Sequence, residues 1–248
     1  MQKRPKILYK YLDLEGSRAF LAKPQLRFKD FRRLDDLMEV LPGHRKLSEE
    51  EIAKYAPVKA QQLGNTISVA KCAHFLRSLS GVSGAYLEDG MRELLLAESA
   101  TLFICSMTER WDSGAMWGPY AEHHKGIVFG LSSAIDRICR LDRTYLADVR
   151  YSDERPQMPF PVIDRKVIKE AIRTKSTDWS YQKEWRLVSD SDADELLNAA
   201  DVAEIIIGYE SRKDVELTGP AASLKKTGTE VFVAYPDPQL HRMARRAL

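Results

Sequence analysis

The stretch Thr101-Leu102-Phe103-Ile104-Cys105-Ser106-Met107 decides the fold. It is a continuous apolar run of strand length, which is typical of a β-strand buried on both faces. The segment Lys125-Gly126-Ile127-Val128-Phe129-Gly130-Leu131 has the same character. The sequence therefore predicts a sheet at the centre of the protein.

Short β-like segments continue outward from these two runs, at residues 7–11, 25–29, 147–151, 184–188, 202–208 and 230–235. Helical patterns lie mainly in the first half, at residues 18–22, 48–79 and 88–98, with two more at 162–174 and 212–226. Helices gathered in one half and strands in the other favour an α+β protein over a regularly alternating parallel sheet. We predict an α+β fold with a mixed or antiparallel central sheet. It is expected to form a single domain over residues 1–248, with a helical insertion at about 36–100.

Local signals place several helix boundaries. Ser17 is expected to cap the helix at 18–22, and Ser48 with Glu51 three residues later predicts a capping box. Pro57 and Gly64 are expected to break the helical sequence that follows. The basic tail at residues 241–246 is interpreted as the last turn of a helix rather than a binding patch.

Charge and cysteine content narrow the class of protein. Lys and Arg total 38 against 36 acidic residues, and a net charge of +2 does not favour a nucleic-acid or membrane partner. Cys72, Cys105 and Cys139 are widely spaced and odd in number, which predicts free thiols in a reducing compartment. No apolar stretch follows the basic N-terminus, and none approaches the roughly 20 residues of a membrane span. We expect a soluble, cytoplasmic protein.

The first segment that could carry chemistry is residues 116–126, between the two apolar runs. It holds Trp117, Tyr120 and the adjacent histidines His123 and His124, and connections dense in polar and aromatic groups often carry sites. The alternative is that the aromatic rings pack on the core while the histidines face solvent. No metal is expected, because the histidines are neighbours and the ligand spacings usual for zinc are absent.

The second segment is residues 175–187, which includes Gln182, Glu184 and Arg186. Residues two apart on a strand share a face, so these three side chains are expected to point one way. Four others are expected to point the opposite way: Tyr181, Lys183, Trp185 and Leu187. A carboxylate beside a carboxamide in a cleft can orient a hydroxyl or stabilise developing positive charge. The alternative is a surface ion pair of Glu184 with Arg186 or Lys183, which would contribute little to stability.

At these two segments the chain resembles the bacterial family named domain of unknown function 2971. The family block Met-Trp-x-x-Tyr-Ala-x-x-His-x-Gly corresponds to residues 116–126 and places the family histidine at His124. The block Lys-x-x-x-Trp-x-Tyr-Glu-x-Glu-Trp-Arg corresponds to residues 175–186, with Gln182 where a glutamate is usual. Softer correspondences lie at residues 8–11, 34–37 and 205–208.

The block order is similar to that of ADP-ribosyltransferases of the diphtheria-toxin type. The resemblance implies NAD as a substrate, with Lys10 or Tyr11 on the ribose or phosphates and Tyr120 stacked on nicotinamide. Glu184 would bond the nicotinamide-ribose 2′-OH and favour an oxocarbenium-like state. Gln182 would face the acceptor, as in transferases that modify protein side chains. Further contacts with the cofactor are assigned to Trp117, His124 and Arg186. The histidine or arginine usual on the first strand of these enzymes is absent.

The sequence thus leads to three hypotheses about function. The first is an NAD-dependent transferase with a small-molecule nucleotide substrate and a macromolecular acceptor, as an effector in toxin or anti-phage defence. The second is a nucleotide-binding or nucleic-acid-binding module without catalysis that stacks bases on its aromatic side chains, although the neutral charge counts against nucleic acid. The third is a structural or interaction protein whose aromatic blocks are core. The first hypothesis predicts that residues 116–126 and 175–186 lie side by side and line one pocket.

Overall fold

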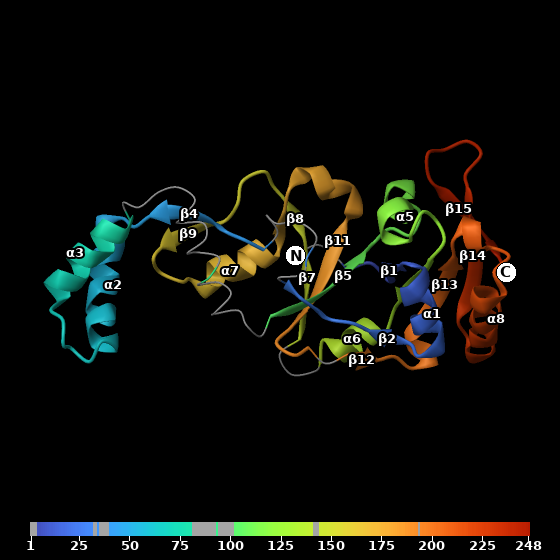
Figure 1. Ribbon diagram of the computed structural model, residues 1–248, viewed down its shortest axis with the longest axis horizontal. Coiled ribbons are helices and arrows are strands. Elements are labelled where there is room, and N and C mark those ends of the chain that lie inside the picture. Colours follow the sequence, from blue (N-terminus) through green and yellow to red (C-terminus); the bar gives the residue numbers. More distant parts are fainter. Residues whose placement is uncertain are drawn as a thin grey trace. The chain divides into compact units, whose positions relative to one another are not determined.

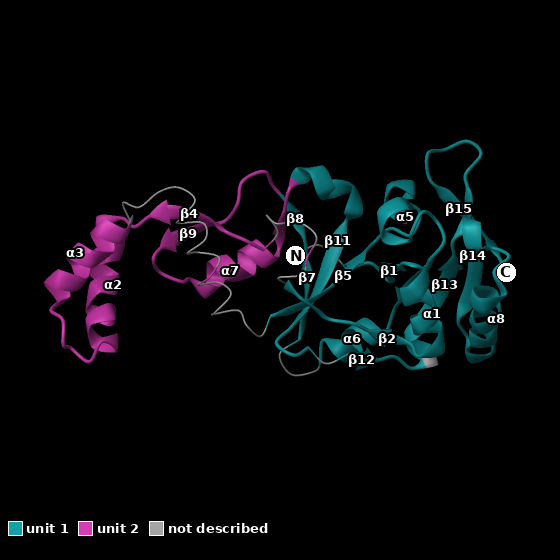
Figure 2. Ribbon diagram, in the orientation of Figure 1, with its two compact units in different colours: residues 1–33, 101–151, 177–248 teal, residues 34–100, 152–176 magenta. Residues whose placement is uncertain are grey.

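The computed structural model describes residues 4–31, 34, 40–80, 93, 102–140, 144–192 and 194–248. The chain divides into two compact units (Figure 2). Unit 1 comprises residues 1–33, 101–151 and 177–248, and unit 2 comprises residues 34–100 and 152–176. The single-domain organisation stays a prediction. Most of the expected helix at 88–98 and most of the family correspondence at 34–37 lie outside the described residues.

Unit 1 is built on one large sheet with the strand order β15-β14-β13-β6-β1-β5-β11-β7 and with β3 beside β5. Its strands are β1 (Leu8–Leu12), β3 (Lys29–Asp30), β5 (Phe103–Thr108), β6 (Ile127–Leu131), β7 (Tyr145–Asp148), β11 (Glu184–Ser189), β13 (Val202–Ile207), β14 (Glu230–Pro236) and β15 (Met243–Ala247). Neighbours are antiparallel except β13 and β14, which are parallel. The predictions of an α+β class and a mixed central sheet are confirmed.

Helices cover both faces of this sheet (Figure 1). One face carries α1 (Leu14–Ala22), α6 (Ala134–Ile138) and α8 (Val215–Leu224), whose buried side chains share a core with the sheet. Within that core the rings of Phe20 and Phe129 stack, with centroids 4.0 Å apart. The opposite face carries α5 (Gly114–Tyr120), and we call it the α5 face. The two apolar runs thus form β5 and β6, and both are buried as expected.

The remaining elements of unit 1 are short. They are β2 (Gln25–Leu26), β8 (Arg150–Tyr151), β12 (Glu195–Leu196), η2 (Thr177–Gln182), η3 (Ala199–Asp201), η4 (Tyr209–Ser211) and η5 (Lys225–Thr227). The expected strand at 25–29 is divided between β2 and β3.

Two local expectations for unit 1 are wrong. Asp13 rather than Ser17 caps α1, because the helix begins at Leu14 and the Asp13 carboxylate accepts the Gly16 N–H at 2.6 Å. The basic tail forms strand β15 and pairs with β14, so it is not the end of a helix. Pairing with a distant strand outweighs the local charge pattern there.

Unit 2 contains a helical hairpin and a small parallel sheet. Its elements are β4 (Gly43–Lys46), α2 (Glu49–Gln62), α3 (Val69–Ser80), β9 (Gln157–Phe160), α7 (Arg165–Ile172) and β10 (Thr174–Lys175), and β4 pairs with β9. The capping box of Ser48 and Glu51 is confirmed, and Gly64 lies in the turn after α2 with φ of 63°. Pro57 lies inside α2, so the expected break there is wrong.

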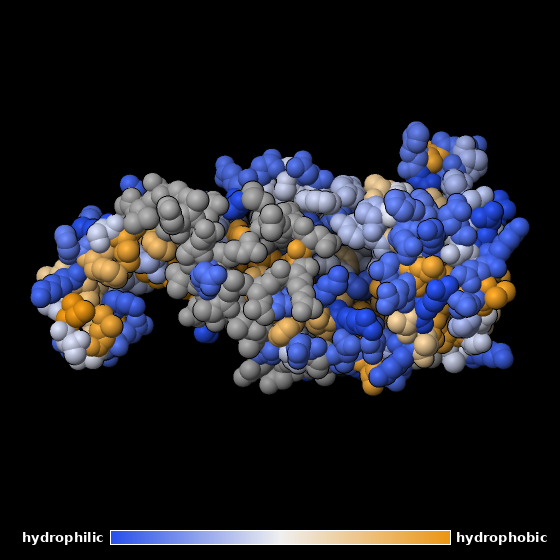
Figure 3. All heavy atoms as spheres, viewed as in Figure 1, coloured by the Kyte–Doolittle hydropathy of each residue, from blue (hydrophilic) through white to orange (hydrophobic). Residues whose placement is uncertain are grey.

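Apolar side chains remain exposed on α2, α3 and the turn between them, where orange residues show in Figure 3. They are Val58, Leu63, Ile67, Val69 and Phe75. The inner side of the hairpin buries Ile52, Ala56, Cys72 and Leu76. Throughout the described ranges, every helix is too short or too polar to cross a membrane.

Candidate functional site

Three neighbouring strands bring candidate residues together on the α5 face. In the sheet register Thr108 of β5 pairs with both Tyr9 of β1 and Glu184 of β11. Trp185 belongs to the core on the other face, so Glu184 and Arg186 point to the α5 face, because successive strand residues alternate. Tyr11 packs into the α5-face core.

The two candidate segments meet at a hydrogen bond. The Gln182 side-chain amide donates to the Tyr120 hydroxyl at 2.7 Å, and the Gln182 carbonyl accepts the Thr108 hydroxyl at 2.5 Å. Gln182 is 4% exposed and Tyr120 is partly buried, so the junction is covered mainly on the Gln182 side. The predicted contact between residues 116–126 and 175–186 is confirmed, and a shared pocket stays a prediction.

Gln182 is not on a strand, which changes one expectation. It ends the 3-10 helix η2, and Lys183 then adopts a left-handed backbone with φ of 43° before β11 begins. Side chains therefore alternate between the two faces of the sheet only from Glu184 onward. Tyr181, expected on the opposite side, packs against the α5-face core.

Glu184 and Arg186 form a buried ion pair. The Arg186 Nε donates to Glu184 Oε1 at 2.8 Å, and the two residues are 0% and 5% exposed, respectively. A solvent-exposed pairing is therefore excluded. Because both charges are buried, removing either side chain would leave the other as an uncompensated buried charge, which is strongly destabilising.

Tyr151 is a neighbour of Glu184 that the sequence analysis missed. Its hydroxyl oxygen accepts the Glu184 backbone N–H at 2.7 Å. Burial raises the pKa of Tyr151 to about 12, so this hydroxyl stays protonated at neutral pH. The only available signal was its place at the end of the strand expected at 147–151.

The loop after β5, residues 109–113, is fixed by contacts from several elements. The Arg110 N–H donates to the Thr108 hydroxyl at 2.9 Å, and the Arg110 carbonyl accepts the Tyr11 hydroxyl at 3.0 Å. The Trp111 carbonyl accepts the Trp117 indole N–H at 2.7 Å. Three further hydrogen bonds attach the loop to β11 and β15: Trp185 Nε1 to Glu109 Oε1, Glu109 N to the Lys183 carbonyl, and Met243 N to the Asp112 carbonyl. These hydrogen bonds attach the loop to β1, α5, β11 and β15.

Of the predicted ligand contacts in α5 and its loop, Trp117 is fully buried and His124 is partly buried. Trp117 is 0% exposed and packs edge-on to Tyr11. His124 stacks on Trp117 with its ring nearly parallel, and its Nδ1 is buried with no hydrogen-bond partner in the described structure. Burial lowers the pKa of His124. This part of the block builds the core around the site.

Lys10 lies on the face opposite to Glu184. It pairs with Phe129, whose ring belongs to the core under α1, and its Nζ donates to the Ser106 carbonyl at 2.9 Å. Of the two residues proposed for the first strand, Tyr11 is the one on the α5 face.

Backbone conformation is unusual just before β6. Glu122, His123 and His124 all have positive φ, between 47° and 67°. Such values are uncommon for residues other than glycine and persist where surrounding contacts fix them. Glu122 Oε2 accepts the Leu14 N–H at 3.2 Å, and the His124 carbonyl accepts the Glu210 N–H at 3.1 Å. The left-handed turn is thus attached to both α1 and η4.

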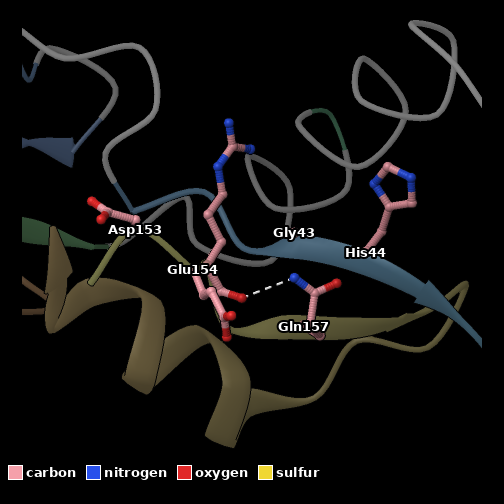
Figure 4. Close-up of a pocket in the computed structure, with 6 residues that line it drawn as sticks. Gly43, His44, Asp153, Glu154 and Gln157 are labelled. Carbon is pink, nitrogen blue, oxygen red and sulfur yellow. Dashed lines mark hydrogen bonds between the residues drawn. The ribbon is translucent and has the colours of Figure 1, made fainter. Parts of the chain in front are cut away.

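Unit 2 contains a separate hollow of about 570 Å³ between the start of β4 and the segment before β9 (Figure 4). It is lined by Gly43, His44, Asp153, Glu154, Arg155 and Gln157. The Gln157 amide donates to the Arg155 carbonyl at 2.9 Å. Within the described residues, no group of three or more His, Cys, Asp or Glu side chains is arranged to hold a metal ion.

Comparison with known families selects the same two blocks. Residues 116–187 match the family model of DUF2971, a protein of unknown function. The resemblance to this family is confirmed over that segment. The DUF2971 segment begins at Met116 and ends at Leu187, so it includes the Tyr120–Gln182 bond and the Glu184–Arg186 pair. No curated protein and no solved structure matches the chain.

Proposed function

We propose that the protein is an NAD-dependent ADP-ribosyltransferase-like enzyme. Its site would lie on the α5 face where β5 ends and β11 begins. The observation that carries the proposal is the 2.7 Å hydrogen bond between Tyr120 and Gln182, two residues from Glu184. This bond joins an aromatic ring of one candidate segment to a carboxamide of the other, and it supports the proposal because Glu184 follows Gln182 by two residues.

The proposed reaction breaks the bond between ribose C1′ and the nicotinamide nitrogen. The bonding electrons leave with nicotinamide, and positive charge develops on the ribose ring. Glu184 would bond the 2′-OH and stabilise that charge, as carboxylates do in glycosyl transfer. A nucleophile on a macromolecular acceptor then attacks C1′ and loses its proton. Action as an effector in toxin or defence systems extends this proposal.

Neighbouring residues would position these groups. Arg186 fixes the Glu184 side chain, and Tyr151 fixes its backbone N–H. Gln182 holds the Tyr120 hydroxyl, which sets the orientation of the ring proposed to stack on nicotinamide. A fixed constellation favours catalysis because little reorganisation is needed when charge develops.

A second candidate function is that of a structural or interaction protein. The burial of Glu184 and its pairing with Arg186 favour it, because a structural ion pair has this geometry. The two candidates differ in what Glu184 contacts when NAD is present.

Nicotinamide release from NAD by the purified chain separates the two candidates. We expect Glu184→Gln to lower the rate by about a hundredfold to a thousandfold, as for loss of one transition-state contact. Tyr120→Phe keeps the ring and removes the hydroxyl that Gln182 contacts, so a smaller loss of activity is expected.

Glu204→Gln is the matched control. Glu204 is 1% exposed, lies on β13 of the same sheet and pairs with Arg245 Nη1 at 2.5 Å. The Glu204→Gln variant should be less stable than wild type but equally active when rates are compared at equal folded fraction. Equal rates for wild type and Glu184→Gln would remove Glu184 from the mechanism. A wild type that neither binds nor cleaves NAD would favour the structural or interaction protein.

A further inference from the structure

The α5-face site contains one fixed cation whose terminal nitrogens have no partner within the described part of the chain. The Arg110 Nε donates to Asp112 Oδ1 at 2.9 Å, and the side chain is 34% exposed. Nη1 and Nη2 make no hydrogen bond to any described residue. A guanidinium offers two parallel N–H donors to a carboxylate or phosphate, and this pair of donors is available.

Arg110 is attached to the same residues that build the site. Its N–H donates to Thr108, the register partner of Glu184, and its carbonyl accepts from Tyr11. The Arg110 side chain is itself held by Asp112, two residues on in the same loop. The sheet therefore holds the Arg110 backbone, and Asp112 holds its guanidinium.

The other cations near the site are less suited to an anionic ligand. Arg186 is fully enclosed and paired with Glu184, and Lys10 lies on the opposite face. Lys183 is exposed and its ammonium has no fixed partner in the described structure, so ligand binding would have to order its side chain. Arg110 combines access with a fixed position.

We propose that Arg110 binds a phosphate or pyrophosphate group of the ligand of the α5-face site. The proposal deepens the proposed function, on which it rests, and gives the ligand class as phosphate-bearing. A bidentate contact with Nη1 and Nη2 would hold the charged part of a dinucleotide while its ribose approaches Glu184. It also supplies a positive charge on the α5 face, whereas the cation of the first strand, Lys10, lies on the opposite face.

Titration calorimetry with three probes tests the assignment: NAD, inorganic pyrophosphate and nicotinamide riboside, which lacks the pyrophosphate. Arg110→Gln should weaken NAD and pyrophosphate binding by about tenfold to a hundredfold, as expected for loss of a charge-assisted bidentate contact. Binding of nicotinamide riboside should be unchanged. Arg110→Lys keeps the charge without the fork, so an intermediate loss for NAD is expected.

Arg18→Gln is the matched control, because Arg18 lies on α1 on the other side of the sheet and pairs with Glu216. It changes net charge equally and should leave all three affinities unchanged. Wild-type affinity for NAD in Arg110→Gln would overturn the role of Arg110 while leaving the transferase proposal intact. Pyrophosphate binding that depends on Arg110, without cleavage of NAD, would support the anion site and overturn the transferase. No binding of NAD or pyrophosphate by wild type would overturn both.

Discussion

Replacing Glu184 with Gln should destabilise unit 1, although the two side chains are nearly isosteric. From sequence, folding is expected to change little, because Gln keeps the shape of Glu and no core volume is lost. The structure corrects this expectation, because Glu184 is buried and balances the charge of a fully enclosed Arg186. Removing one partner of a buried ion pair leaves an uncompensated charge.

The size of the loss in stability depends on which contacts of Glu184 the Gln side chain keeps. Complete loss of a partner from a buried pair costs about 3–5 kcal/mol. The Gln amide oxygen can still accept from Arg186 Nε, so the cost lies below that range. We expect a loss of about 2 kcal/mol in the free energy of unfolding. For a chain of this length that lowers the melting temperature by about 4–8 °C.

Urea unfolding followed by tryptophan fluorescence measures this loss in unit 1 alone. The four tryptophans, Trp111, Trp117, Trp179 and Trp185, all belong to that unit. A double-mutant cycle with Arg186→Met should give a coupling energy above about 1 kcal/mol. A Glu184→Gln protein within about 0.5 kcal/mol of wild type, with no coupling, would refute the argument from burial.

Two further predictions concern the connection between α5 and β6. Burial lowers the pKa of His124 from its ordinary value of 6.5, so the unfolded chain takes up the proton first as pH falls. Stability should therefore decrease as pH falls below about 6.5, and less so in His124→Asn, as measured by melting temperature against pH. Gly126→Ala would place a Cβ 1.8 Å from the Leu12 carbonyl oxygen and should cost about 3 kcal/mol or more. Gly118→Ala, with open space at its Cβ, should melt at or above the wild-type temperature.

Much of the sheet could be predicted from local pattern. The continuous apolar runs are β5 and β6, and Ser48 with Glu51 marks the start of α2. What local pattern does not carry is the order of the strands. β1 lies between β5 and β6, so the first strand joins two runs more than 90 residues away. The tail was misjudged for the same reason, because its strand exists only through pairing with β14.

In the candidate site, too, some residues could be predicted from local sequence pattern and others could not. Density of aromatic and polar residues identified Tyr120, Gln182 and Glu184, and the structure joins the first two directly. Arg110 and Tyr151 were missed because their places depend on sheet register rather than on neighbouring sequence. Thr108 pairs with Glu184 and positions Arg110, and neither relation follows from local pattern. The burial of Glu184 could not be predicted either. Strand alternation shows which face of the sheet Glu184 is on, but not how deeply that face is covered.

The two buried carboxylate–arginine pairs on the α5 face distinguish a structural role from a chemical one. Glu204 and Glu184 are both nearly inaccessible and each is bound to one arginine. Their surroundings differ. The partner of Glu204, Arg245, stacks over Trp111 and Phe232, which makes that pair part of the aromatic packing. Glu184 instead adjoins the Tyr120–Gln182 bond and the register partner that positions Arg110. If buried charge served only to hold the sheet, the Gln variants of Glu184 and Glu204 would differ in stability alone. A chemical role for Glu184 requires that the Glu184→Gln variant cleave NAD more slowly than wild type, and that the Glu204→Gln variant cleave it at the wild-type rate, when rates are compared at equal folded fraction.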